Sequence, residues 1–226
     1  MCSQFTVKFS QADLFEHLAN LKFNFSVLEG KLPSRAFPGT QTLAIKHEEE
    51  SEQAGHPEWM RFGLIPRWAK EEKVPFATHN ARIETLLEKP TWKEAFLKRH
   101  CVVPMSGFIE SIYTGKHAGY CIEIAAPNKG ILFAAGIWEA WENKKSGEVL
   151  ESFSVITRDP YPQVQKVGHD RSPIFLSLDG IKTWLEMKGP GDKQVKDLLN
   201  LTFTPTFEIE NDRPLKPGWE KRIPKS

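Results

Sequence analysis

Residues 101–141 read CVVPMSGFIESIYTGKHAGYCIEIAAPNKGILFAAGIWEAW, and this stretch decides the fold. It contains three apolar runs, Cys101–Ile109, Gly119–Ala125 and Ile131–Trp141, separated by gaps of turn length that are rich in glycine, lysine and asparagine. Runs of this kind are typical of β-strands, and the middle run alternates in polarity, as a strand with one wetter face does. Strand following strand through short gaps favours an antiparallel or mixed sheet over a doubly wound parallel one.

The same reading extends to both sides of this stretch. Four further runs are predicted as strands: Leu43–Lys46, Trp59–Leu64, Phe153–Thr157 and Phe203–Ile209. Four helices are predicted from their start signals and apolar stripes: one capped by Ser10 with Asp13, one opened by Pro90, one carrying Ile181, Trp184 and Leu185 and ended by Gly189-Pro190, and one opened by Asp192. We therefore expect an α+β fold, with a mixed, mainly antiparallel sheet or barrel-like core, flanking helices and a single domain over residues 1–226.

Composition narrows the function classes. The 226 residues carry 30 Lys+Arg against 29 Asp+Glu, so a polyanion would have to be bound by a local patch rather than by overall charge. No stretch has the length of a membrane span, and the N-terminus lacks a basic region followed by an apolar run, which predicts a soluble cytoplasmic protein. The three cysteines, Cys2, Cys101 and Cys121, have no C-x-x-C spacing. We expect no disulfide framework, no metal, no cofactor and a monomer.

Cys2 stands apart because removal of Met1 would leave a cysteine with a free α-amine beside its thiol. Such a 1,2-aminothiol can attack an aldehyde with nitrogen and then close a five-membered ring with sulfur, or act as an N-terminal nucleophile in acyl transfer. Alone the signal is weak, since a second-position cysteine is usually an accident of coding.

Four other segments combine polar residues with strand-end or loop context: Gly63–Trp68, Thr78–Thr85, Pro104–Glu110 and Gly168–Pro173. Each has an ordinary structural explanation, such as a capped turn, a surface ion pair or a gap filled in the core. Their occurrence together with Cys2 favours a functional explanation for the set.

The chain resembles the SOS-response-associated peptidase (SRAP) family, also described as abasic-site processing proteins. The resemblance rests on these motifs, in this order: Met1-Cys2, Pro38-Gly39-Thr40, Gly63-Leu64-Ile65-Pro66-x-Trp68, Asn80-Ala81-Arg82-x-Glu84-Thr85, Gly107-Phe108-x-Glu110 and His169-x-Arg171-x-Pro173. It implies a single domain that binds single-stranded DNA and links its mature N-terminal cysteine to the ring-opened aldehyde of an abasic site.

The resemblance also implies roles for individual residues. Cys2 matches the family's nucleophile, Asn80 its site-organising asparagine, Glu110 its catalytic glutamate and His169 its catalytic histidine. The DNA-binding positions that it implies are Arg67, Trp68, Arg82, Thr157 and Arg171, with the two arginines Arg82 and Arg171 on phosphates and Trp68 in the segment that packs on displaced bases.

The chemistry of these side chains agrees with those roles. Imine formation expels the aldehyde oxygen as water, which requires a positioned acid near pH 7, and His169 or a buried Glu110 could supply it. Addition of the thiol to the imine then closes a thiazolidine. Asn80 can donate and accept hydrogen bonds at once, arginine offers bidentate phosphate contacts, and tryptophan offers a face for stacking.

The sequence also departs from the family pattern. Gln4 stands where the family usually has an arginine, the usual asparagine before Ala-Pro-Gly-Thr is replaced in Ser34–Phe37, and Ser172 replaces a common methionine. These changes concern DNA binding more than cysteine chemistry. Two alternatives therefore stay open, a cysteine-type peptidase that cuts itself or a partner and a noncovalent single-stranded DNA-binding module.

Overall fold

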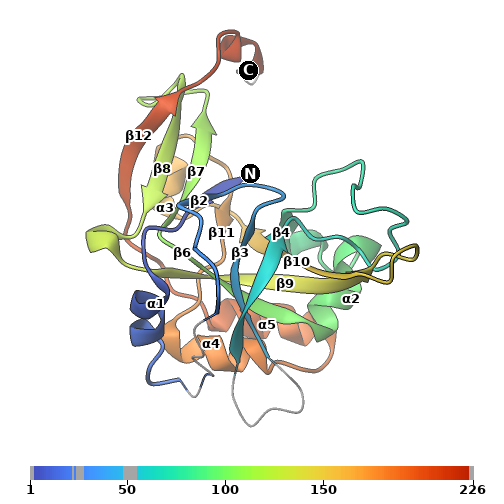
Figure 1. Cartoon of the computed structure of the whole chain (residues 1–226). Coiled ribbons are helices and arrows are strands. Elements are labelled where there is room, and N and C mark those ends of the chain that lie inside the picture. The colour runs from blue at the N-terminus through green and yellow to red at the C-terminus, as the bar shows by residue number, and fades with distance from the viewer. Residues whose placement is uncertain (1–2, 22, 24–27, 48–54, 224–226) are drawn as a thin grey trace.

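The computed structural model describes residues 3–21, 23, 28–47 and 55–223, and its centre is a closed barrel (Figure 1). The larger of two sheets has the strand order β11-β10-β4-β3-β6-β9, and β9 also pairs with β10, so β10, β4, β3, β6 and β9 form a closed ring and β11 is attached to β10 outside it. β5 is attached to β10 outside the ring. The bounds are β3 Gln41–Lys46, β4 His56–Phe62, β5 Asn80–Arg82, β6 His100–Met105, β9 Leu132–Glu142, β10 Val149–Arg158 and β11 Ser172–Pro173.

The smaller sheet has the order β12-β8-β7-β1-β2, and all its pairings are antiparallel. Its strands are β1 Gln4–Thr6, β2 Arg35–Ala36, β7 Gly107–Ile112, β8 Tyr120–Ala125 and β12 Glu208–Pro214. The two edge strands meet through side chains, because the Arg35 guanidinium on β2 donates to both carboxylate oxygens of Asp212 on β12 at 2.6 and 3.0 Å. That hydrogen-bonded partner lowers the pKa of Asp212. The sheet is therefore curled rather than flat.

Among the named strands of the described part of the chain, only β10 with β4 and β10 with β5 pair in parallel, and an isolated bridge between Phe23 and Gly55 is also parallel. The prediction of a mixed, mainly antiparallel sheet with a barrel-like core and flanking helices is therefore confirmed. On β8, Ile122 and Ile124 are fully buried, while Glu123 on the opposite face binds Thr6 and Lys8. The alternation in that run thus reports a real difference between the two faces.

The run Cys101–Ile109 is not one strand, and this prediction was wrong. The chain leaves the barrel at the end of β6, turns at Ser106 and enters the other sheet as β7. Ser106 closes the corner by donating its N–H to the Thr6 carbonyl and accepting the Lys8 N–H on its hydroxyl. A Cβ on Gly107 would lie 2.7 Å from the backbone of β8, so only glycine lets the two strands approach there. Because the sequence stays apolar across this turn, the pattern does not reveal that the chain passes from one sheet to the other.

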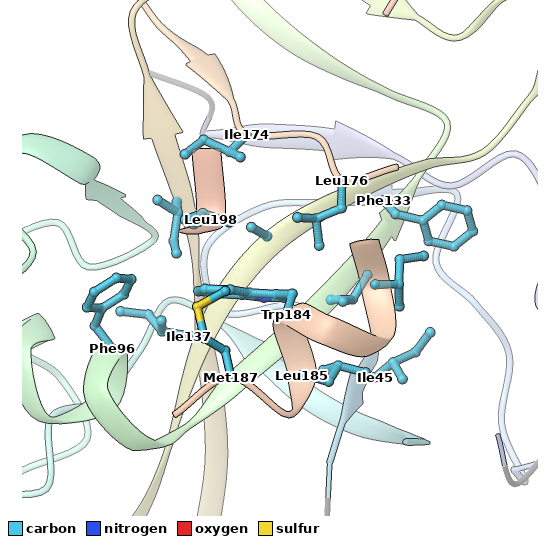
Figure 2. Close-up of a cluster of buried hydrophobic side chains, with 14 of the residues drawn as sticks. Ile45, Phe96, Phe133, Ile137, Ile174, Leu176, Trp184, Leu185, Met187 and Leu198 are labelled. Atoms are coloured by element: carbon cyan, nitrogen blue, oxygen red, sulfur yellow. The ribbon is translucent and has the colours of Figure 1, made fainter. Parts of the chain in front are cut away.

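The helices pack against the barrel and enclose one of two buried clusters (Figure 2). Trp184 lies at its centre, donates its indole N–H to the Cys101 carbonyl at 2.9 Å and stacks on His100. The helices are α1 Gln11–His17, α2 Pro90–Lys98, α3 Pro162–Lys166, α4 Leu178–Leu185 and α5 Gly191–Asn200, with short 3-10 turns η1 Ile83–Thr85, η2 Pro127–Lys129 and η3 Trp219–Arg222. The second cluster joins the barrel to the smaller sheet through Phe5, Phe62, Phe108 and Phe153.

Helix starts agree with prediction better than helix ends. Ser10 and Asp13 form a reciprocal capping box at α1, Pro90 is the first residue of α2, and α5 opens one residue before Asp192. The third predicted helix, α4, ends at Leu185 rather than at Gly189-Pro190. The predicted strand Phe203–Ile209 was wrong for most of its length, because β12 begins at Glu208. No helix in the described ranges is long and apolar enough to cross a membrane.

Candidate functional site

A buried acid–base pair lies where β7 meets the loop after α3. Glu110 on β7 has 4% of its side chain exposed and His169 has 9%, and His169 Nε2 lies 3.0 Å from Glu110 Oε2. The sequence predicted partial desolvation of Glu110, and the observed burial agrees. Little water reaches these two side chains, so a proton shared between them is held in a fixed geometry.

The backbone of its own loop orients His169. Gly168, with φ +89°, ends α3 in the left-handed conformation and lets the chain turn, and the His169 N–H then donates to the Val164 carbonyl at 3.3 Å. Nδ1 of His169 lies 3.0 Å from the Arg171 carbonyl oxygen and 3.3 Å from the Arg171 nitrogen. A neutral ring accepts the N–H and donates Nε2–H to Glu110, and a protonated ring donates to the carbonyl instead. Both protonation states therefore have partners.

The side chain of Arg171 fixes the loop that carries His169. Its Nη1 and Nη2 donate to the two oxygens of Glu84 at 2.9 Å each, Nη2 also donates to the Thr157 carbonyl at 2.8 Å, and Nη1 reaches Asp159 at 3.3 Å. The Arg171 side chain is 8% exposed, and Thr157 is fully buried beneath it. Burial by itself would raise the pKa of Glu84, but the Arg171 hydrogen bond and charge outweigh it and the pKa is lowered.

Asn80 lies on the other side of the same strand end. β5 runs parallel to β10, with Asn80 opposite Val155 and Arg82 opposite Thr157, and Thr157 is also paired with Pro173 of β11. Asn80 is buried at 7% exposure, whereas Arg82 is exposed. The end of β10 therefore brings together two motifs that are far apart in the sequence, the one containing Asn80 and the one containing His169.

The start of the described chain also leads to this pair. β1 pairs with β7 so that Gln4 is opposite Ile109, the residue before Glu110. Cys2 lies outside the described residues. The Gln4 amide oxygen accepts a hydrogen bond from Arg213 Nη2 at 3.1 Å, and Asp212 holds Arg213 together with Arg35. The departures at positions 4 and 35 therefore meet in one network.

Exposed aromatic and basic side chains lie on the segments that precede and follow Asn80. Trp68 is 56% exposed and Phe76 is 44% exposed, and their ring centroids lie 6.3 Å apart. The Arg67 side chain is 56% exposed, and its Nε lies 3.7 Å from Glu139 Oε2. The loop that holds Trp68 is linked to the Asn80 segment because the Leu64 N–H donates to the Thr78 carbonyl. We call Arg67, Trp68, Phe76 and Arg82 the open surface.

The sequence missed several residues that the structure places here. Phe76 and Asp159 lie outside the motifs, and the motif that contains Glu84 does not show that Glu84 pairs with Arg171, since exposure and ion pairing depend on distant residues. His79 is also missed. Burial lowers its pKa, and the charge of Glu110 opposes that shift. Within the described ranges no group of three or more His, Cys, Asp or Glu side chains has the arrangement of a metal site.

Comparison with known proteins now identifies the class. The family described as SOS response associated peptidase (SRAP) matches residues 1–211. This chain belongs to the SRAP family, as its motifs predicted.

Curated relatives give the class a finer description. "Abasic site processing protein YoqW" of Bacillus subtilis is 30% identical over 203 residues, covering 88% of this chain and 86% of the relative. "Abasic site processing protein YoaM" of the same organism is 29% identical, covering 88% and 85%. "Abasic site processing protein HMCES" of Gallus gallus is 31% identical, covering 78% of this chain and 62% of that longer protein.

Solved structures confirm the fold. A crystal structure of a protein from Bordetella bronchiseptica superposes with a TM-score of 0.73 at 20% identity, covering 95% of this chain and 100% of that one. A second, from Bacteroides thetaiotaomicron, gives 0.71 at 20% identity, covering 97% and 99%.

Proposed function

We propose that this protein captures abasic sites in single-stranded DNA and that Cys2, once Met1 is removed, forms a thiazolidine with the lesion's aldehyde. One observation supports the proposal most: the buried Glu110–His169 pair, at 3.0 Å, beside the strand that leads to Cys2. Cys2 is two residues before Gln4, a reach of roughly 7 Å of extended chain. The register of β1 against β7 therefore supports the assignment of Cys2 to this pair.

The reaction needs two proton transfers, and the pair has the right groups for both. The α-amine adds to the aldehyde carbon, and the resulting hydroxyl leaves as water when it receives the proton held between His169 and Glu110. Loss of that water leaves a protonated imine. The thiol then returns one proton to the pair, and sulfur adds to the imine carbon, which leaves the ring nitrogen neutral. One water is released overall, and the ring makes the adduct longer-lived than an imine. Asn80 is assigned to hold the amine or the opened sugar.

The two arginines that the motifs assign to DNA phosphates, Arg82 and Arg171, have different surroundings. The Arg171 guanidinium is occupied by Glu84, Asp159 and Thr157. We therefore assign Arg171, with Thr157 beneath it, to positioning His169 through the loop backbone. Arg82 and Arg67 are exposed and are assigned to phosphates, and Trp68 with Phe76 is assigned to base stacking.

The test is a denaturing gel with Met-free protein and single-stranded DNA carrying one abasic site, run beside Cys2→Ala and lesion-free DNA. We expect a shifted band that requires both Cys2 and the lesion. If no band forms while an established aldehyde-reactive control does, the covalent proposal fails. Retained binding without a band would then indicate a noncovalent module, and peptide turnover detected by mass spectrometry would indicate a peptidase.

A further inference from the structure

A small pocket lies at the end of the smaller sheet, between the last residues of β7 and the segment that follows β12 (Figure 1). Its volume is about 190 Å³, below the roughly 300–1,000 Å³ of drug-sized ligand sites, so it suits a single planar ring. None of the described residues that line it is acidic, and its aromatic, basic and hydroxyl-bearing members are Ser111, Tyr113, Lys216, Trp219 and Arg222. The part of the lining that follows β12 lies beyond residues 1–211, which the family matches. We call it the Trp219 pocket.

The Trp219 ring is held against the turn between β7 and β8. The Leu215 N–H donates to the Gly119 carbonyl at 2.7 Å, which ties the segment after β12 to that turn. Gly119 has φ +86°, and a Cβ there would lie 3.0 Å from Trp219 Cζ2, so a larger residue would be strained and would press on the ring. The ring itself stays partly exposed. Its position is therefore set before a ligand binds, which lowers the entropy cost of stacking on it.

The basic side chains of the Trp219 pocket are not engaged by carboxylates. Lys216 and Arg222 are exposed, and neither forms an ion pair with a described residue. Arg222 Nη1 lies 3.5 Å from the Tyr113 hydroxyl, so the guanidinium faces the pocket. From position 215 to 223 the chain has three basic residues and one acidic residue, Glu220. An excess of positive charge beside an aromatic ring is the combination that binds single-stranded nucleic acid.

The Trp219 pocket lies beside the strand that carries Glu110, toward the opposite face of the sheet. Ser111 follows Glu110 directly, and successive side chains of a strand point to opposite faces. Ser111 shares its face with Gln4, because Gln4 is opposite Ile109 in the pairing of β1 with β7. Arg213 Nη2 donates to the Gln4 amide oxygen at 3.1 Å and so crosses this face from β12. A DNA strand that follows β1 away from the pair would therefore pass Arg213 and reach the pocket.

The turn between β7 and β8 also contacts the loop that carries His169. A Cβ on Gly168 would lie 3.1 Å from the Thr114 carbonyl oxygen, so the two segments approach each other closely. Tyr113, in the wall of the pocket, is the residue before Thr114. The pocket and the Glu110–His169 pair therefore belong to one packed frame, and a nucleotide in the pocket would have a defined distance from the lesion.

We propose that the Trp219 pocket binds one unpaired base of the DNA strand beside the lesion. The base stacks on Trp219, the Tyr113 hydroxyl meets its polar edge, and Lys216 and Arg222 bind the flanking phosphates. This inference rests on the proposed function for the identity of the strand. It makes affinity depend on the presence of a base at one position of the strand, separately from the stacking assigned to Trp68 and Phe76.

The test uses the Met-free full chain and single-stranded oligonucleotides with a reduced abasic site, which has no aldehyde. A second, base-free nucleotide is placed at each position in turn on either side of that site, and affinity is measured by fluorescence anisotropy. In wild-type protein we expect one position at which loss of the base weakens binding about tenfold and Trp219→Ala abolishes this dependence, because the stacking partner is already gone. Trp68→Ala should keep the dependence at that position.

A second variant tests the charges and leaves the ring in place. Lys216→Ala/Arg222→Ala should reduce the salt slope of binding by about 1.4, at roughly 0.7 for each single-strand phosphate. The matched control, Lys193→Ala/Lys196→Ala, removes two exposed lysines from α5 and should leave the slope unchanged. Equal slopes in the two double variants would overturn the assignment of the phosphates, even if Trp219→Ala folded poorly.

The outcomes separate this inference from the proposed function. If wild-type protein binds the oligonucleotides but no position shows a base dependence that requires Trp219, the pocket does not hold a base and the inference is overturned. If wild-type protein binds no single-stranded DNA, the proposed function fails together with it. Because the probe cannot crosslink, a failure of the covalent chemistry alone would leave these results unchanged.

Discussion

Two regions of this protein differ in how far their functional side chains are exposed to solvent. In the buried region, the side chains of Glu110, His169 and Arg171 are each less than one-tenth exposed, and hydrogen bonds and ion pairs hold the imidazole, its loop and the guanidinium in place. On the open surface, Trp68 and Phe76 are about half exposed and Arg82 faces solvent. Proton transfer benefits from a dry, fixed geometry, whereas capture of a flexible strand benefits from accessible rings and charges. The comparison therefore separates the region to which we assign the chemistry from the region to which we assign DNA binding.

The largest effect is expected on the crosslinking rate, from a substitution at Glu110 in the buried region. Glu110→Gln keeps the shape of the side chain but removes a group that can carry the proton, so the crosslinking rate at saturating DNA should fall by about 10²–10⁴-fold. Affinity for lesion-free single-stranded DNA should stay within about twofold. Single-turnover gels and anisotropy measure the two quantities. Glu148→Gln, at an exposed position, is the control. A normal rate in Glu110→Gln would remove this residue from the mechanism.

A smaller effect tests the support beneath His169. Glu84→Gln leaves the Arg171 guanidinium without its ionised bidentate partner, so the His169 loop should loosen and the crosslinking rate should drop roughly tenfold. Glu84→Asp should recover part of the rate, which a purely nonspecific loss of stability would not predict. An unchanged rate in Glu84→Gln would show that Arg171 holds the loop without Glu84.

The ion pair between Glu84 and Arg171 predicts that the stability of the fold depends on pH. The pKa of Glu84 is lowered in the folded state, so its contribution is present above the unfolded value of about 4.3 and is lost as pH falls below it. Thermal melts of wild type and Glu84→Gln should therefore differ at neutral pH and converge in the acid range. A difference that persisted unchanged at pH values well below about 4 would contradict the assignment.

Changes on the open surface should affect binding and leave chemistry intact. Trp68→Ala and Phe76→Ala should each weaken single-stranded DNA binding by about tenfold, as one lost base stack predicts, with little change in melting temperature because both rings are exposed. The crosslinking rate at saturating DNA should be preserved. Val149→Ala, another exposed apolar position, provides the control. A slower saturated rate would mean that the rings also position the lesion.

The smallest effect is expected on DNA affinity and its salt dependence when one exposed arginine is removed. Arg82→Ala should lower affinity a few-fold and reduce the salt slope by about 0.7, the value for one single-strand phosphate. Lys193→Ala, which removes an exposed lysine from α5, should leave the slope unchanged. If Arg82→Ala changed the crosslinking rate but not the slope, the division between the two regions would be wrong at this residue.

Local signals predicted part of the fold correctly. Ser10 with Asp13 and Pro90 fix helix starts through groups within a few residues, and those predictions are confirmed. The strands β1, β2, β5 and β11 have only two or three residues and show no periodicity, so the sequence gives no sign of them. The turn at Ser106 was not predicted because its hydrogen-bond partners, Thr6 and Lys8, are distant in the chain.

The sequence by itself determined the family and the mixed sheet and supplied the candidates for the reactive groups, because motif order, alternation and side-chain chemistry are all properties of the chain. Only the tertiary structure decided that β9 closes on β10, that His169 meets Glu110, and that Arg171 is enclosed by Glu84 while Arg82 faces solvent. The physical reason is that burial and ion pairing depend on which distant segments are packed together, and two arginines with similar motif contexts acquire different surroundings only when the end of β10 lies between them.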